Sequence, residues 1–306
     1  MAGALPPAPQ GGTGWGRLKG PLLIPTWAMI GVFLLIPVLL MAVYSFLTKE
    51  FRGGVVWDFT LAAYDQFFFN RGLFGDEPPV LEWTYITIFW RSIWQAGLAT
   101  VLCLVVGFPT AWFIATRPPA QRSVWLFLIT IPYWVNLLIR TVSLKFLIRD
   151  NGPLNEFLMG LGVIADPLPL VNTNLAVQLG LFYSYLPFMV LPIYAAVERY
   201  NFALSEAAAD LYAPRWTILR EVVLPVVRPG IVAGCILVFV PSLGAFLAPD
   251  LLGGAKTYMI GSLIDEQFKG SQGNWPFGAA VSVVLMTLVL IALLFQARAA
   301  AKGGRE

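Results

Sequence analysis

The most constraining feature of the sequence is a series of six apolar segments, each long enough to cross a lipid bilayer. A helix needs about 20 residues to span a hydrocarbon core of roughly 30 Å. Of the 306 residues, 58% are hydrophobic and 12% are charged, a balance that a soluble chain cannot cover with polar surface. The sequence therefore predicts an all-α, polytopic membrane protein with one transmembrane domain over residues 26–297. The predicted spans cover residues 26–47, 88–115, 124–148, 174–197, 231–248 and 277–296.

The orientation is predicted from Lys and Arg, which concentrate in the cytoplasmic loops of membrane proteins. Eleven of the 20 basic residues lie at the termini or in the loops on the same side, and six lie in the opposite loops. Residues 1–25 are therefore expected to be a disordered cytoplasmic lead-in without a cleaved signal peptide, and residues 298–306 a cytoplasmic tail. Most acidic residues lie in the outer loops, which favours a cationic solute.

The sequence excludes several kinds of chemistry. It has no histidine, which removes imidazole metal sites and Ser/His/Asp triads, and its two cysteines, Cys103 and Cys235, lie inside apolar segments. The net charge of +3 is too small to indicate nucleic-acid binding. The stretch from Gly253 to Thr257 is not a phosphate-binding loop, because Ala255 and Asp250 stand where that motif requires glycine. No catalytic, metal or ATPase site is therefore expected in this chain.

A polar stretch from Ser205 to Gly230 separates the fourth and fifth spans. Ser205 is a suitable N-cap and Glu206 complements the helix dipole, so a short helix is predicted from Ser205. Pro214 disfavours helical angles at Ala213, which predicts a hinge there. A second helical piece is expected to begin at Pro214 and to end at Pro225.

This stretch resembles the EAA loop of binding-protein-dependent ABC importer permeases. Glu206-Ala207-Ala208 is followed by Val222-Val223-Leu224-Pro225 at the family's spacing, and one position departs from the pattern. Tyr212 stands where the family has a glycine that suits a left-handed helix end, a conformation that costs tyrosine about 1 kcal/mol. The coupling residues that the resemblance implies are Glu206, Ala207, Ala208, Tyr212, Val222, Leu224 and Pro225.

The resemblance also implies a fold and partners. The fold is that of type I (MetI-like) importer permeases in the bacterial inner membrane. Residues 198–230 are the loop on which ABC ATP-binding subunits dock, and ATP and Mg²⁺ act in those subunits, so this chain is expected to bind no cofactor. A second permease subunit, identical or paralogous, and a periplasmic solute-binding protein complete the complex within the membrane lipid.

From Leu175 to Ala280 the chain is also similar to the permeases of spermidine/putrescine importers. The segments YLPFMVLPIYAA, VPSLGAFLAPDLLGG, MIGSLIDEQF and NWPFGAA carry this similarity, as does IRDNGPLN upstream. A polyamine path needs spaced carboxylates and aromatic faces. The residues available for such a path are Asp250, Asp265, Glu266, Tyr183, Tyr185, Trp94 and Trp134, each of which also has an ordinary interpretation as a solvated loop acid or a packed aromatic.

Arg140, inside the third predicted span, has two interpretations, since it can pair with an acid or shape a gate. Its charge opposes a cation-lined path at that depth.

Three alternatives for the function stay open. A permease of the same class could carry ferric iron, an oxyanion or an opine-like compound. An ion-coupled secondary carrier or channel would work without an ATPase. A membrane-embedded enzyme is disfavoured by the lack of histidine and of any nucleophile or metal constellation.

Overall fold

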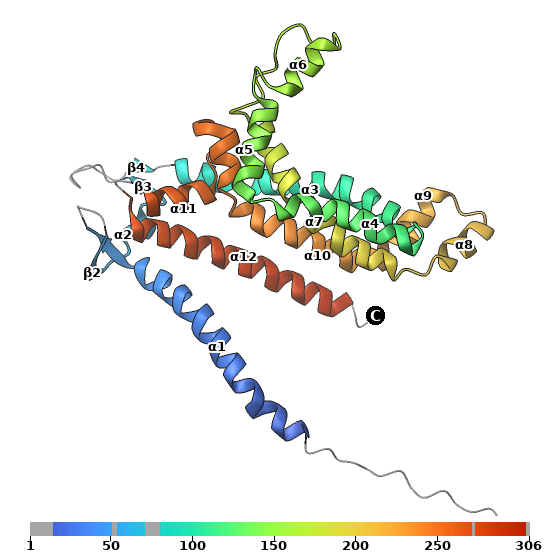
Figure 1. The fold of residues 1–306 in the computed structure, drawn as a ribbon. Coiled ribbons are helices and arrows are strands. Elements are labelled where there is room, and N and C mark those ends of the chain that lie inside the picture. The colour runs from blue at the N-terminus through green and yellow to red at the C-terminus, as the bar shows by residue number, and fades with distance from the viewer. Residues whose placement is uncertain (1–14, 51–53, 71–79, 82, 271–272, 304–306) are drawn as a thin grey trace, which may run out of the picture.

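The computed structural model describes residues 15–50, 54–70, 80–81, 83–270 and 273–303 (Figure 1). Helices dominate this part of the chain, and the strands form two small sheets of two strands each. Five helices are long and apolar enough to cross a membrane, and a bent pair raises the number to as many as six, which agrees with the all-α prediction. Four of them are in α1 (Trp15–Tyr44), α3 (Thr84–Ala115), α7 (Asn174–Glu198) and α12 (Trp275–Gly303), and the fifth runs from Arg215 to Leu243 and includes α10 (Leu224–Leu243).

The segment between α1 and α3 forms a cap at one end of the helices, where α11 also lies (Figure 1). Two antiparallel strand pairs in this cap are joined by a short helix, and Phe67 beside it packs on Phe277 of α12 with ring centroids 5.2 Å apart. The elements of the cap are β1 (Leu47–Lys49), β2 (Val55–Phe59), α2 (Ala62–Asp65), β3 (Phe69–Asn70), β4 (Val80–Leu81) and α11 (Ile260–Lys269). The segments η3 (Pro249–Gly253) and η4 (Gly254–Thr257) precede α11, and η3 contacts α7.

The centre of the molecule is the packing of α7 against α3 and α10. Met189 of α7 is fully buried between two glycines, one on each neighbouring helix. A Cβ added at Gly107 of α3 would lie 2.9 Å from Cγ of Met189, and one added at Gly234 of α10 would lie 2.9 Å from its sulfur. Small residues at helix crossings let membrane helices approach closely, and dispersion contacts then hold them together.

The third predicted span, residues 124–148, is not one straight helix. The segments Pro119–Trp134 and Leu137–Gly160 are bent by 92°. The break has a local cause, because Pro132 lacks the N–H that a continuing helix needs, and Asn136 caps a new helix by accepting a hydrogen bond from the Leu138 N–H at 2.8 Å. The elements are α4 (Pro119–Thr130), η1 (Ile131–Trp134), α5 (Leu137–Ile148) and α6 (Pro153–Gly160), and the last two project away from the bundle (Figure 1).

Helix α1 begins at Trp15, inside the stretch that was predicted to be disordered, so that prediction is wrong for residues 15–25. Pro21 and Pro25 lie inside this helix, as membrane helices tolerate where neighbouring groups satisfy the freed carbonyls. Residues 1–14 lie outside the described part of the chain. Near the cap α1 lies beside α12 and then diverges from it (Figure 1), and none of its apolar window is buried in this chain.

The crossing of α7 and α10 yields a prediction about stability. A Cβ at Gly230 of α10 would lie 2.7 Å from the backbone oxygen of Pro192 in α7, which cannot move aside as a side chain can. Gly230→Ala should therefore push the helices apart and lower the free energy of unfolding by about 1–3 kcal/mol. Thermal unfolding of the purified protein in detergent measures this change.

The matched control is Gly97→Ala on α3, where an added Cβ meets nothing within 4 Å. This variant should be as stable as the wild type or slightly more stable, because alanine favours the helix. Equal stability of the two variants would contradict the proposed close contact.

Candidate functional site

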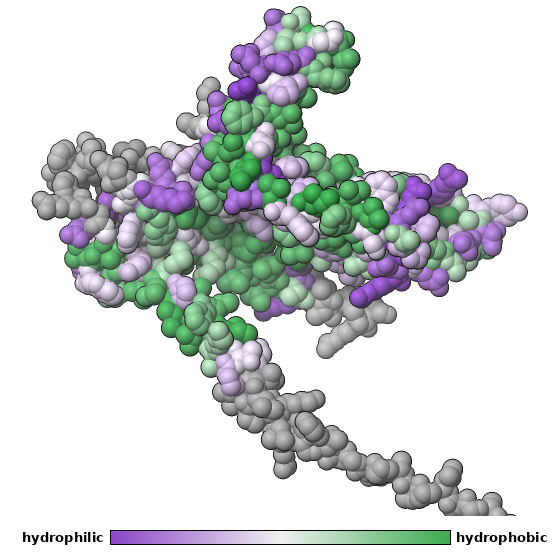
Figure 2. Space-filling view, in the orientation of Figure 1, coloured by the Kyte–Doolittle hydropathy of each residue, from purple (hydrophilic) through white to green (hydrophobic). Residues whose placement is uncertain are grey.

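The polar stretch between the fourth and fifth spans forms a helical turn at the end of the bundle opposite the cap (Figure 1). It contains α8 (Ala203–Asp210), α9 (Arg215–Thr217) and the π-helical segment η2 (Ile218–Val223), which runs directly into α10. Figure 2 shows hydrophilic residues gathered over α8 and α9, in contrast to the hydrophobic surface of the helices.

Two predictions about this turn are wrong. The second helical piece does not end at Pro225, because η2 runs without a break into α10, whose second residue is Pro225. Residues 224–230, assigned to the loop, therefore belong to the fifth apolar helix. Ser205 is not the N-cap of α8, since the helix begins at Ala203, whose N–H donates to Oδ1 of Asn201 at 3.1 Å.

The C-terminal end of α8 is closed by two backbone hydrogen bonds. The Ala213 N–H donates to the Ala208 oxygen at 3.1 Å, and the Tyr212 N–H donates to the Ala209 oxygen at 2.9 Å. These bonds form a Schellman motif, which requires a left-handed residue between them. Tyr212 is that residue, with φ of +59°, and the break between α8 and α9 follows at Pro214 with ψ of 149°.

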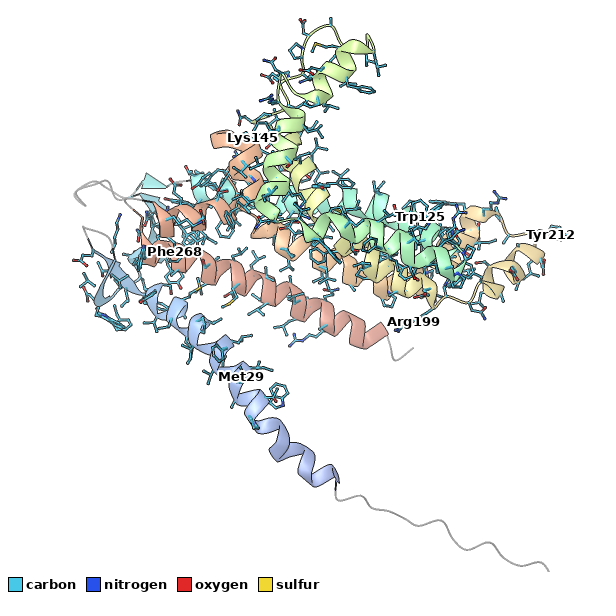
Figure 3. The ribbon with its side chains drawn as sticks, in the orientation of Figure 1. Met29, Trp125, Lys145, Arg199, Tyr212 and Phe268 are labelled. Atoms are coloured by element: carbon cyan, nitrogen blue, oxygen red, sulfur yellow. The ribbon has the colours of Figure 1, made fainter. Side chains whose placement is uncertain are left out.

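The tip of the turn exposes three large apolar side chains. Leu211 is 82% exposed, Tyr212 is 95% exposed and Trp216 is 69% exposed. In Figure 3, Tyr212 points away from the rest of the chain. Exposed apolar and aromatic side chains grouped in this way are typical of protein contact surfaces. Of the other predicted coupling residues, Glu206, Ala207 and Pro225 are exposed, whereas Ala208, Val222 and Leu224 are half-buried.

An aromatic cluster attaches the turn to the helices. The ring of Trp112, near the end of α3, lies 6.3 Å from that of Tyr200 and 5.5 Å from that of Phe202, and Tyr200 and Phe202 are 5.3 Å apart. Tyr200 is 4% exposed, and its hydroxyl is hydrogen-bonded to that of Ser205 in α8 at 2.7 Å. Tyr200 therefore contacts both α3 and α8.

A polar contact joins α4 to the last turn of α7 beside this cluster. Nη1 of Arg122 lies 3.5 Å from Oε1 of Glu198, which also accepts a 2.6 Å hydrogen bond from Tyr194. Neither the aromatic cluster nor the contact between Arg122 and Glu198 was predicted to belong to the site. The signals in the sequence are an aromatic residue at the end of one span and a charged residue at the start of the next.

Two of the predicted path residues, Trp134 and Tyr185, line one cavity of about 370 Å³ at the break between α4 and α5. The ring of Tyr183 is close to the same place, 5.7 Å from the guanidinium of Arg140, which also lines the cavity. The hydroxyl of Tyr185 donates to the backbone oxygen of Pro241 at 3.3 Å.

Glu266 lines a different cavity, of about 650 Å³, between the start of α3 and α11. The aromatic residues Trp83, Tyr85 and Tyr258 line it as well, and the Tyr258 hydroxyl donates a hydrogen bond to Glu266. Arg91 of α3 also lines it, so the cavity holds charges of both signs.

The remaining predicted path residues do not join these cavities. Asp265 forms an ion pair with Lys269 at 2.6 Å. Asp250 is exposed on η3, and Trp94 is 63% exposed on α3. The seven residues are thus divided between two cavities and separate surface positions.

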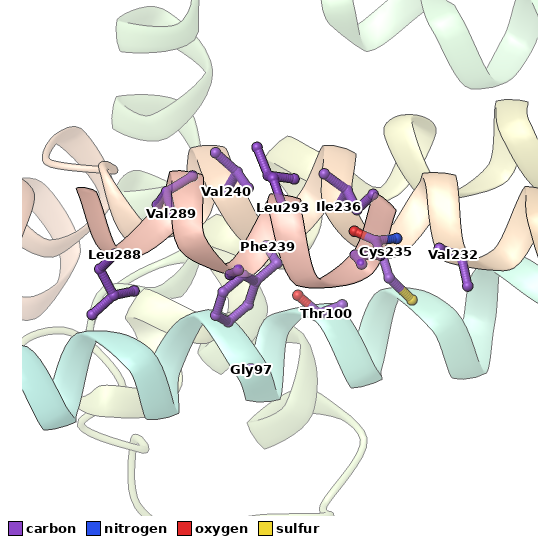
Figure 4. A pocket seen from close by; sticks show the side chains of 12 residues that line it. Gly97, Thr100, Val232, Cys235, Ile236, Phe239, Val240, Leu288, Val289 and Leu293 are labelled. Carbon is purple, nitrogen blue, oxygen red and sulfur yellow. The ribbon is translucent and has the colours of Figure 1, made fainter. Parts of the chain in front are cut away.

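A third cavity, of about 410 Å³, lies between α3, α10 and α12 and is lined mainly by aliphatic side chains (Figure 4). Its walls offer no charged group among the described residues. Within the same part of the chain, no group of three or more Cys, Asp or Glu residues could hold a metal ion.

Comparisons with known proteins agree on one kind of protein. Residues 107–301 match the family model of the binding-protein-dependent transport system inner membrane component. The chain is 38% identical to the spermidine/putrescine transport system permease protein PotB of Haemophilus influenzae over 90% of its length and 91% of the relative. Its identity to PotB of Escherichia coli is 40%, over 89% of this chain and 94% of that protein.

The fold is also that of a solved structure. A crystal structure of a bacterial ABC transporter involved in the import of the acidic polysaccharide alginate matches with a TM-score of 0.68 at 17% identity, over 94% of this chain and 96% of that one. The predicted type I importer fold is thereby confirmed.

The Schellman turn yields a prediction about amide exchange. Tyr212→Gly should preserve or increase the protection of the amides at positions 212 and 213, because glycine adopts the left-handed conformation freely. Tyr212→Val should reduce their protection about tenfold, since a β-branched residue is strongly disfavoured at positive φ. Hydrogen–deuterium exchange followed by mass spectrometry of this peptide measures both. The same protection in all three proteins would contradict the left-handed turn.

Proposed function

Because the chain belongs to the family of binding-protein-dependent transport system inner membrane components, we propose that it is the permease subunit of an ATP-driven importer of polyamines. The observation that supports polyamines as the substrate is the similarity to PotB, which extends over nine-tenths of the chain. The chain works by alternating access and has no ATPase site of its own, so ATP and Mg²⁺ act in a partner subunit. A second permease subunit and a periplasmic binding protein complete the complex. The excess of Lys and Arg supports a cytoplasmic location of both termini and of α8 and α9.

In this proposal the ATP-binding subunit contacts the tip formed by Leu211, Tyr212 and Trp216, together with the exposed Glu206. A large apolar surface that is rimmed by polar residues favours docking into a groove of another protein. The Schellman motif fixes the direction of the tip, because it closes α8 before the chain turns at Pro214.

The aromatic cluster carries movement of α8 into the membrane helices. A displacement of α8 acts on Tyr200 through the hydroxyl of Ser205, and Tyr200 is packed on Trp112 of α3. The direct continuation of η2 into α10 gives a second connection. Closely packed elements transmit a shift because they cannot deform continuously.

The cavity around Glu266 is where we place the first contact with the solute. A polyamine carries ammonium groups on methylene stems, so it needs a carboxylate for charge and aromatic faces for cation–π contact and packing. Glu266 supplies the carboxylate, and Trp83, Tyr85 and Tyr258 supply the aromatic faces. Asp265 is less suitable, because Lys269 already neutralises it.

The Tyr200–Ser205 hydrogen bond yields a prediction about coupling. Tyr200→Phe keeps the aromatic packing and removes only the hydroxyl, so the complex should still hydrolyse ATP while solute uptake per ATP falls a few-fold, as expected for one hydrogen bond of about 1 kcal/mol. Uptake and phosphate release are measured together in proteoliposomes.

Ser205→Ala should have the same effect, and the double variant should be no worse than either single one, because all three lack the same bond. Tyr44→Phe is the matched control, since its hydroxyl has no hydrogen-bond partner among the described residues. A Tyr200→Phe complex with unchanged coupling would remove this bond from the mechanism.

The assembled complex, reconstituted with its ATPase and binding protein, should take up labelled spermidine or putrescine only when ATP is present. Glu266→Gln should raise the KM for uptake about tenfold without reducing assembly, because it removes the charge and leaves the shape. Uptake is measured with the polyamines and with molybdate and ferric iron as unrelated solutes.

Asp265→Asn is the control on the same helix and should have little effect on KM. Uptake of molybdate or iron in place of polyamines would instead support a permease for another solute. Transport by this chain without an ATPase would support an ion-coupled carrier. Either of these two results would overturn the proposal.

A further inference from the structure

Arg140 is a buried cation at the break of the third span. It lies in the first turn of α5 and is 7% exposed. Its guanidinium lies over the ring of Tyr133, 4.8 Å from the centroid, and Nη1 donates to the backbone oxygen of Pro132 at 3.3 Å. Its Nε is buried and has no hydrogen-bond partner among the described residues. The arginine is therefore held in place by aromatic faces and one carbonyl group.

The charge of Arg140 is not neutralised within the described part of the chain. None of the ion pairs between these residues includes Arg140, so pairing with an acid, one of its two predicted roles, is not found there. Ring faces and a carbonyl oxygen stabilise a guanidinium but leave its net charge in place. The field of this charge therefore acts on the space beside it.

That space is the cavity of about 370 Å³ at the break, which Arg140 lines. The cavity is also lined by Asn136 and Leu137, where α5 begins. The N-terminal end of a helix carries a partial positive charge. Arg140 and the start of α5 therefore make the same cavity positive, although its other walls, Tyr185 and Phe188 among them, are of the aromatic kind that attracts cations.

We propose that Arg140 and the N-terminal end of α5 form an electrostatic barrier that keeps small inorganic cations from leaking through the permease. A fixed arginine and the positive end of a broken helix are known to exclude cations from membrane pores. At a separation of about 8 Å and an effective dielectric constant of about 20, repulsion by the unit charge of Arg140 lowers the population of a monovalent cation in the cavity about 30-fold. The inference depends on the proposed function in one respect, namely that the transport path passes this cavity.

The same groups could also bind an anion, and the two roles have opposite consequences. A barrier works because the cavity stays positive, so removal of the charge opens the path to cations. An anion site works because an anion neutralises Arg140, so removal of the charge abolishes anion binding and leaves cation leakage unchanged. The similarity to PotB favours the barrier, since a polyamine path has no need for a bound anion.

The test uses the assembled complex in proteoliposomes loaded with K⁺, without ATP and without polyamine. Arg140→Gln should raise the efflux of K⁺ about 30-fold over the wild type, and Arg140→Lys, which keeps the charge, should stay close to the wild type. Lys145→Gln is the matched control, because Lys145 lies on the same helix (Figure 3) but does not line the cavity, and its efflux should be unchanged.

An assembled Arg140→Gln complex that is as tight to K⁺ as the wild type would overturn the barrier. Equal leakage of Arg140→Gln and Arg140→Lys would also overturn it, because the charge would then not matter. If Arg140→Gln does not assemble, Arg140→Met supplies an uncharged side chain of similar length, and the same two outcomes decide. Because the assay contains no polyamine, a failure of polyamine uptake would overturn the proposed substrate and not this barrier.

Discussion

The structure depends on the close approach of three helices around one side chain. Met189 of α7 fits between Gly107 of α3 and Gly234 of α10, and each of these glycines would collide with it if it carried a Cβ. Apolar burial contributes little between helices in lipid, so contacts of this kind supply the cohesion. Because these contacts fix α7 against both α3 and α10, they also position the segments that precede and follow α7.

The turn formed by α8 and α9 is the clearest case. It follows the last residues of α7, is packed on α3 through Trp112 and continues into α10 through η2. The three helices that meet at Met189 thus also hold the turn, so its exposed tip is connected to the tightly packed centre. The strained φ of Tyr212 is tolerated because two backbone hydrogen bonds close the motif around it.

The parts of the fold that could be predicted from the sequence are those set by local composition. The apolar segments follow from hydropathy alone, and the left-handed position of Tyr212 is implied by the resemblance to the EAA loop, which has a glycine at that position. The break of the third span could not be predicted because the residues around Pro132 are as apolar as an unbroken span. The start of α8 could not be predicted because Asn201 and Ser205 are equally good capping residues, whereas the helix begins after Phe202, which makes no side-chain cap hydrogen bond. The predicted path residues do not form one site. They share only acidic or aromatic character, which does not reveal which surfaces tertiary packing brings together.

The two cavities with predicted path residues make different demands on a cation. The one around Glu266 offers a carboxylate with Arg91 on the same cavity, whereas the one around Arg140 presents a cation without an acidic residue in its lining. A small hydrated ion has nothing to offset that repulsion, since aromatic walls cannot replace its water. An organic polycation spreads its charge along a stem that can pack on Trp134, Tyr185 and Phe188, so its burial there offsets part of the repulsion. In the proposed barrier, an uncompensated arginine among aromatic side chains therefore distinguishes an organic cation from an inorganic one, although both carry the same sign of charge.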